Sequence, residues 1–246
     1  MLKEEFSEIL EEYLNNLHQT GSAWCLGREG SIKFLEDYEK HGTGREYLYF
    51  KNQKEEELLN LNKMYLVYMF CLFEGYISDI IYFLFKNKSE CLKSEQKKID
   101  FNFQYFIEST KEEMLESIIR NELVKISVNP DRLKDYFIKN PFRIDLQELC
   151  TFTELDEIWL GERRIDIALS KESYWEDLRE YYNMRNVIVH RSGVIDQFYI
   201  DNIKNSKYKI GDKPNINDNY VNYCLELIAY TMVKINLEFT KKYANG

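Results

Sequence analysis

The sequence predicts an all-α fold, and three observations support that prediction. The 246 residues include only three prolines and ten glycines, so few residues that break helices interrupt the chain. Between them, apolar residues recur at helical intervals rather than alternately, which indicates helices rather than strands. Hydrophobic residues make up 44% of the chain and charged residues 30%, a balance typical of globular proteins. We therefore expect a helical bundle with a substantial core.

The first third of the chain is expected to contain two helices separated by a looser segment. Residues 2–18 place their apolar side chains on one stripe, as in an amphipathic helix. Glycines and a histidine punctuate residues 19–53, so we expect a less regular structure there. A long helix follows at residues 55–86. Its centre, MYLVYMFCLFEGYISDIIYFLF, is apolar on nearly every face, which predicts the innermost helix of a bundle.

The same apolar centre raises the question of a membrane span. It is long enough to cross a bilayer, but it carries Glu74 and Asp79 near its middle. Because charges there would be costly in lipid, we favour a buried helix in a bundle and expect no membrane partner.

Two elements are expected in the middle of the chain. Thr110 and Glu113 have the spacing of a capping box, which predicts a helix from there to about residue 126. Pro130 and Pro141 bracket a second, short helix.

Three elements are expected in the last third. Ser173 and Glu176 repeat the capping-box spacing and open a helix that Gly193 is expected to end. Residues 196–215 contain alternating apolar positions, which predicts a hairpin-like excursion. A final helix is expected from about residue 220 to residue 243.

Composition also limits the classes of function. The five cysteines are widely spaced and contain no Cys-x-x-Cys pair, which favours a reducing compartment. The acidic N-terminal segment does not resemble a secretory leader, so a cytoplasmic location is expected. Three histidines without a metal-binding spacing predict neither metal nor cofactor. The net charge of −9 argues against nonspecific wrapping of a duplex, but it leaves room for a small positive cleft.

The segment YYNMRNVIVHRSG is the strongest candidate for a site. An imidazole is the natural proton carrier near neutral pH, and a permanently charged guanidinium is a natural ligand for phosphate. Arg185 and His190 therefore suit metal-independent cleavage of RNA, in which the 2′-hydroxyl attacks its own phosphate. The structural alternative is a histidine that only interacts with the carbonyl groups and dipole at the end of its helix.

Helical geometry adds a condition to this hypothesis. Residues five apart are displaced by about 140° around a helix, so one helix cannot easily bring Arg185 and His190 together. A symmetric dimer removes the difficulty if two such helices meet at a two-fold axis. Each cleft then receives side chains from both chains, and one imidazole can act as base while the other acts as acid.

These residues also carry a resemblance to a family. RNVIVHRSGVID resembles the Arg-x4-6-His motif of the HEPN superfamily, and Asn186 is the polar residue favoured after the arginine. MYLVYMFCLFEGYISDI resembles an earlier HEPN helix with a Glu between aromatic or apolar residues. The resemblance covers roughly residues 55–90 and 170–243. It implies a HEPN-like up-and-down helical bundle with an N-terminal helical extension (1–54), a helical domain (55–246) and a mid-chain helical insertion (about 92–165).

The resemblance implies a homodimeric, metal-independent endoribonuclease, similar to toxins and antiphage abortive-infection effectors that act on tRNA, mRNA or rRNA. Arg185 would stabilise the scissile phosphate, His190 would be general acid or base, and Asn186 would hydrogen-bond in the cleft. An antitoxin or another protein of a defence system would be a partner. Toxins of this family paired with nucleotidyltransferase antitoxins often carry a modified Tyr where this chain has Ser192.

Two further residues are candidates for supporting roles. Glu74 would face the cleft or orient Arg185, and a structural salt bridge is the alternative. Arg191 would contact RNA phosphates, and a solvated surface charge is the alternative. A different class of function also remains open, because a noncatalytic HEPN-like module for nucleotide or RNA binding, or for scaffolding, fits the same residues.

Overall fold

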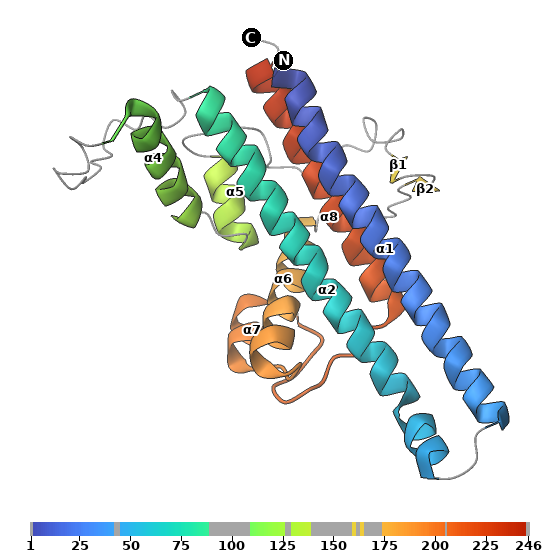
Figure 1. Ribbon diagram of the computed structural model, residues 1–246. Coiled ribbons are helices and arrows are strands. Elements are labelled where there is room, and N and C mark those ends of the chain that lie inside the picture. The colour runs from blue at the N-terminus through green and yellow to red at the C-terminus, as the bar shows by residue number, and fades with distance from the viewer. Residues whose placement is uncertain are drawn as a thin grey trace. The chain divides into compact units, whose positions relative to one another are not determined.

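The computed structural model describes residues 2–41, 45–88, 109–125, 129–138, 159–160, 163–164, 174–204 and 206–244. The fold of this part of the chain is all-α, as predicted, apart from one antiparallel pair of two-residue strands (Figure 1). The elements are α1 (Leu2–His41), α2 (Arg45–Asn87), α4 (Lys111–Lys125), α5 (Pro130–Ile138), β1 (Trp159–Leu160), β2 (Arg163–Arg164), α6 (Tyr174–Arg191), α7 (Gln197–Asn202), α8 (Asp218–Phe239) and the π-helical turn η3 (Thr240–Ala244).

Contacts divide the chain into two compact units. The first unit draws on residues 1–12, 73–151 and 231–246, and the second unit draws on residues 13–72 and 152–230. Helices α1, α2 and α8 contribute segments to both units. The expected domain boundary at residue 54 lies inside α2, and the expected insertion at 92–165 supplies α4 and α5 to the first unit.

Aromatic rings form the core of the first unit. The ring of Phe6 on α1 lies 5.2 Å from that of Phe83 on α2 and 6.1 Å from that of Phe239 on α8. Phe137 of α5 lies 5.5 Å from the same Phe239 ring. These rings bring together segments from four helices, because large buried aromatic side chains remove much apolar area from water.

Helix α4 begins as its capping box predicts. The Thr110 amide donates to Glu113 Oε2 at 2.7 Å, and the Glu113 amide donates to Thr110 Oγ1 at 3.2 Å. Tyr82 of α2 donates to Glu116 at 2.7 Å and so attaches α4 to α2. The short helix expected between the two prolines is also confirmed as α5, which begins at Pro130.

A buried amide joins three segments of the second unit. Asn62 of α2 is 2% exposed, and its Oδ1 accepts from Trp24 Nε1 of α1 at 2.8 Å. Its Nδ2 donates to the Ile216 carbonyl at 2.8 Å and to Asp218 Oδ1, at the start of α8, at 3.1 Å. Arg28 of α1 pairs with the same Asp218 carboxylate. Within this unit α1 therefore runs antiparallel to α2 and α8 in a fixed register (Figure 1).

The expectation of a looser segment at residues 19–53 is wrong. Helix α1 continues to His41, and α2 begins at Arg45. The glycines within α1 cost helix propensity, but packing outweighs this cost. At Gly21 an added Cβ would lie 3.1 Å from the Tyr65 hydroxyl oxygen of α2, so the missing side chain permits close approach of the two helices.

Helix α2 is not covered on every side within the described residues, contrary to the expectation of an innermost helix. It buries a stripe that includes Leu66, Phe70 and Phe73, but Met64 is 70% exposed and Tyr68 is 51% exposed. The part of α2 from residue 56 to 87 is long and apolar enough to cross a membrane by length and composition alone. Core helices of soluble proteins pass the same test, so this is weak evidence for a span.

Helix α6 ends where Gly193 predicts. Ser192 and Gly193 adopt positive φ angles of 52° and 76°, and the Gly193 amide donates to the Val187 carbonyl at 3.1 Å. This bond closes the turn that ends the helix. Ser173, the residue expected to cap the start of this helix, lies outside the described residues.

The hairpin expected at residues 196–215 is wrong, because α7 occupies its first part. Asp196 caps α7 by accepting from the Tyr199 amide at 2.9 Å. The two ends of the excursion do meet, since the Ile195 amide donates to Asp212 O and the Gly211 amide to Ile195 O, each at 2.9 Å. The predicted final helix is confirmed as α8.

Replacing Asn62 with leucine should destabilise the protein by about 2–4 kcal/mol, because the buried Trp24 N–H and Ile216 carbonyl would both lose a partner. Urea unfolding followed by circular dichroism measures this change. Asn87→Leu is the matched control, since Asn87 is exposed and, among the described residues, its side chain bonds only to the Phe83 carbonyl of its own helix. Equal stability of the two variants would contradict the structural role of Asn62.

Replacing Gly193 with alanine should cost about 1–2 kcal/mol, because a residue with a Cβ is strained at positive φ. The nearest atom to an added Cβ is Lys63 Nζ at 3.8 Å, an ordinary contact, so backbone strain alone accounts for the loss. Gly30→Ala, in α1 with open space around it, should instead stabilise the protein by about 0.5–1 kcal/mol. The opposite signs of the two changes can be read from the same urea titration.

Candidate functional site

Helix α6 carries the candidate site at its C-terminal end. Leu178, Tyr181, Met184 and Val187 of α6 are buried, whereas its last residues, His190 and Arg191, are exposed. The acidic first turn and the basic last turn, which contains His190, both complement the helix dipole.

Aromatic contacts hold α6 against α2 and α8 within the second unit. The Tyr181 ring lies 4.3 Å from that of Tyr220 and 5.8 Å from that of Tyr223, both on α8. The Tyr182 ring lies 6.2 Å from that of Phe70 on α2. The end of α6 is therefore positioned by neighbours on two other helices.

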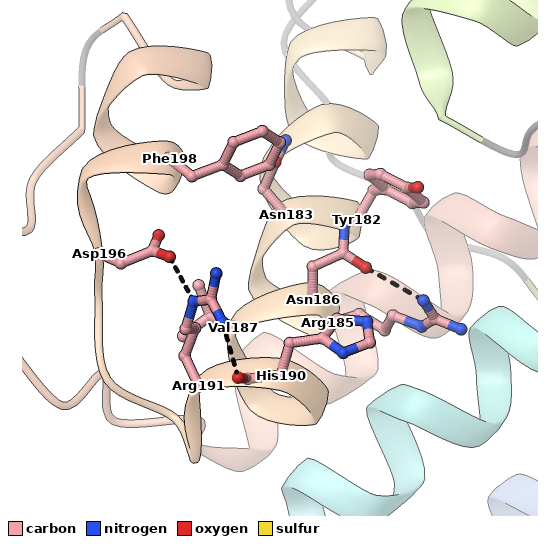
Figure 2. A pocket seen from close by; sticks show the side chains of 9 residues that line it. All are labelled: Tyr182, Asn183, Arg185, Asn186, Val187, His190, Arg191, Asp196 and Phe198. Carbon is pink, nitrogen blue, oxygen red and sulfur yellow. Dashed lines mark hydrogen bonds and ion pairs between the residues drawn. The ribbon is translucent and has the colours of Figure 1, made fainter.

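The outward face of α6 borders an open pocket of about 550 Å³ (Figure 2). Its lining comes from α6, from the turn that follows and from α7. The lining residues are Tyr182, Asn183, Arg185, Asn186, Val187, His190, Arg191, Asp196 and Phe198. Two guanidinium groups and an imidazole thus share the lining with one carboxylate, although the whole chain carries a net charge of −9.

Four of the five predicted site residues line this pocket. These are Arg185, Asn186, His190 and Arg191. The fifth, Glu74, is half-buried on α2 and belongs to the first unit, whereas the pocket belongs to the second.

The Arg185 side chain lies along the helix toward its sequence neighbour. Its Nη1 donates to Asn186 Oδ1 at 3.0 Å, as Figure 2 shows. The Arg185 side chain is half-buried, whereas His190 is exposed. Among the described residues no side chain hydrogen-bonds to the His190 imidazole, so both ring nitrogens are accessible to a ligand.

Arg191 connects the end of α6 to the start of α7. Its Nε donates to Asp196 Oδ2 at 2.7 Å, and its Nη1 donates to the His190 carbonyl at 3.2 Å (Figure 2). The Arg191 guanidinium, together with the Tyr199 amide, lowers the pKa of the Asp196 carboxyl group. Arg191 therefore has a structural role in shaping the pocket.

Five lining residues were not predicted from the sequence: Tyr182, Asn183, Val187, Asp196 and Phe198. The last two lie in residues 196–215, where the alternating apolar positions of QFYIDNIKNSKYKIGDKP favour a hairpin-like excursion rather than a helix. An Asp that directly follows an apolar pair and precedes a short apolar run is also a helix N-cap pattern, and this signal could have identified α7.

A second pocket of about 610 Å³ lies between α2 and the end of α6. We call it the α2–α6 groove. It is lined by Asn60, Lys63, Met64, Val67, Tyr68, Cys71, Ile188, Ser192 and Gly193. Most of this lining is apolar, and Met64 and Tyr68 are the exposed residues of α2 noted above.

The described residues contain no group of three or more His, Cys, Asp or Glu side chains placed to hold a metal ion.

No protein-family model matches the chain, and neither a curated protein nor a solved structure gives a significant match to it.

Proposed function

We propose that this protein is a metal-independent endoribonuclease of the HEPN type that acts as a homodimer in a toxin or antiphage defence role. One observation supports the proposal above all others. Arg185, Asn186 and His190 line one open pocket, the imidazole is accessible, and positive groups outnumber negative ones around it. This is the environment that a phosphodiester of RNA requires.

The chemistry needs no group beyond the side chains and the RNA itself. An imidazole takes the proton of the 2′-hydroxyl while the 2′-oxygen bonds to phosphorus. The bond from phosphorus to the 5′-oxygen breaks, and a second imidazole donates a proton to that oxygen. The Arg185 guanidinium stabilises the negative charge that grows on the phosphate. The products are a 2′,3′-cyclic phosphate and a 5′-hydroxyl.

The second imidazole is the reason for proposing a dimer. A single His190 cannot be base on one side of the phosphate and acid on the other in the same step. At about 100° per residue, Val189 projects from α6 between Arg185 and Asn186. Val189 is 47% exposed, and its neighbour Ile188 lines the α2–α6 groove. Apolar side chains therefore adjoin the candidate site, and a second copy of the chain would cover them.

Replacing His190 or Arg185 with alanine should reduce cleavage of total RNA by about a hundredfold or more, because each change removes a group used in the transition state. Denaturing gels measure cleavage, and wild-type activity should persist in EDTA and leave cyclic phosphate ends. Expression of the wild type, but not of His190→Ala, should arrest cell growth.

His18→Ala and Arg120→Ala are matched controls, since neither residue lines the pocket. Cleavage that persists in the His190→Ala protein would reject the catalytic proposal. Intact RNA with every purified protein, together with RNA binding, would support the noncatalytic alternative instead.

Replacing Met64 and Tyr68 together with glutamate should weaken the dimer about thirtyfold or more, because charges would enter an apolar interface. Both residues lie on α2, so the chemical groups of α6 are unaltered. Sedimentation velocity measures the association state, and circular dichroism reports folding. Leu26→Glu, at a site on α1 that is 70% exposed, should leave the dimer intact. A wild-type monomer that cleaves RNA would contradict this part of the proposal.

A further inference from the structure

Phe198 is an apolar ring in the lining of a pocket that carries two guanidinium groups, an imidazole and one carboxylate. It is 62% exposed, and Figure 2 shows it projecting from α7 toward Asn183 of α6. Among the described residues its ring stacks on no other aromatic ring and lies beneath no cation. An exposed aromatic face in a pocket that also carries guanidinium groups is an arrangement in which proteins stack unpaired bases.

Neighbouring residues hold the backbone of α7, and therefore Phe198, in place. Asp196 caps α7 and is held in turn by Arg191, while the neighbouring Tyr199 is 1% exposed. The backbone pairing of Ile195 with Gly211 and Asp212 closes the excursion that contains α7. The ring is therefore presented by a fixed element, which lowers the conformational cost of stacking on it.

Two amides of the pocket lining have hydrogen-bonding groups of opposite kind left over. Asn183 Nδ2 donates to the Arg179 carbonyl at 2.8 Å, which leaves Oδ1 as an acceptor. Asn186 Oδ1 accepts from Arg185, which leaves Nδ2 as a donor. Both residues line the pocket, and within the described part of the chain neither remaining group has a partner. An acceptor and a donor together match the edge of a nucleobase.

We propose that Phe198, Asn183 and Asn186 form a nucleobase-binding subsite in which the ring stacks on one base and the amides bind its edge. The assignment of that base to the nucleotide beside the scissile phosphate rests on the proposed ribonuclease function. A paired base cannot expose its face to the ring, so the subsite selects unpaired RNA. A peptide is a poorer fit, because the lining carries two guanidinium groups, an imidazole and a carboxylate, whereas the larger apolar surface lies in the separate α2–α6 groove.

The test measures binding in the His190→Ala background, so that the RNA stays intact. The probe is a fluorescein-labelled single-stranded RNA of mixed sequence, followed by anisotropy. Adding Phe198→Ala should weaken binding about ten- to a hundredfold, whereas Phe198→Trp should retain it. Phe34→Ala is the matched control, because Phe34 is 55% exposed on α1 and does not line the pocket.

Two further readouts separate stacking from mere structural support. RNA should quench the added indole emission of Phe198→Trp but not that of Phe34→Trp. Asn186→Ala should reduce discrimination among homopolymers of A, C, G and U while the quenching persists. Equal RNA affinity of the Phe198→Ala and Phe34→Ala proteins would overturn the subsite, as would equal affinity for duplex and single strand. Phe198-dependent binding of another protein, without RNA binding, would also overturn it.

The binding assay is independent of catalysis. Wild-type protein that does not cleave RNA but stacks it on residue 198 would reject the ribonuclease proposal and keep the subsite. Wild-type protein that cleaves RNA, with no effect of Phe198→Ala on binding or cleavage, would keep the ribonuclease proposal and reject the subsite.

Discussion

The buried amide of Asn62 is the interaction on which the second unit depends. It satisfies an indole N–H from α1 and a carbonyl at the entrance to α8, and it also contacts the carboxylate that pairs with Arg28. A buried polar group of this kind is costly unless every partner is present, so it permits one register of the helices and penalises others. Apolar packing alone would tolerate a shift of one helix along another by a helical turn.

Aromatic contacts position the candidate site relative to the helices whose register Asn62 sets. Tyr181 packs on rings of α8, and Tyr182 packs on Phe70 of α2. The end of α6 is thus fixed by the helices that the Asn62 amide aligns, and α7 is fixed in turn by the ion pair of Arg191 with Asp196. The backbone that carries exposed polar side chains such as His190 is therefore held in one position, although these side chains are not buried. A fixed backbone of this kind lowers the entropic cost of binding a ligand.

The sequence allowed prediction of those features that depend on local rules. The capping box of Thr110 and the glycine after α6 are local patterns, and the structure has both where expected. The extent of α1 could not be predicted, because Gly21 is kept helical by a close approach to Tyr65 from a distant part of the sequence. By contrast, the grouping of Arg185, Asn186 and His190 in one pocket could be predicted, because a single short motif contains all three. The presence of Phe198 in that pocket could not be predicted, because its position depends on how the segment between Ile195 and Asp212 folds.

The lining of the candidate pocket comes from a contiguous run of the chain, Tyr182 to Phe198, divided by the turn at Ser192 and Gly193. Arg185, Asn186 and His190 lie before that turn, and the exposed ring of Phe198 lies after it. A change in α7, or in the length of the turn, could therefore alter which ligand is admitted without disturbing the reactive groups. If the proposed function holds, the ligand preference of this pocket could change during evolution while the residues before the turn stay the same.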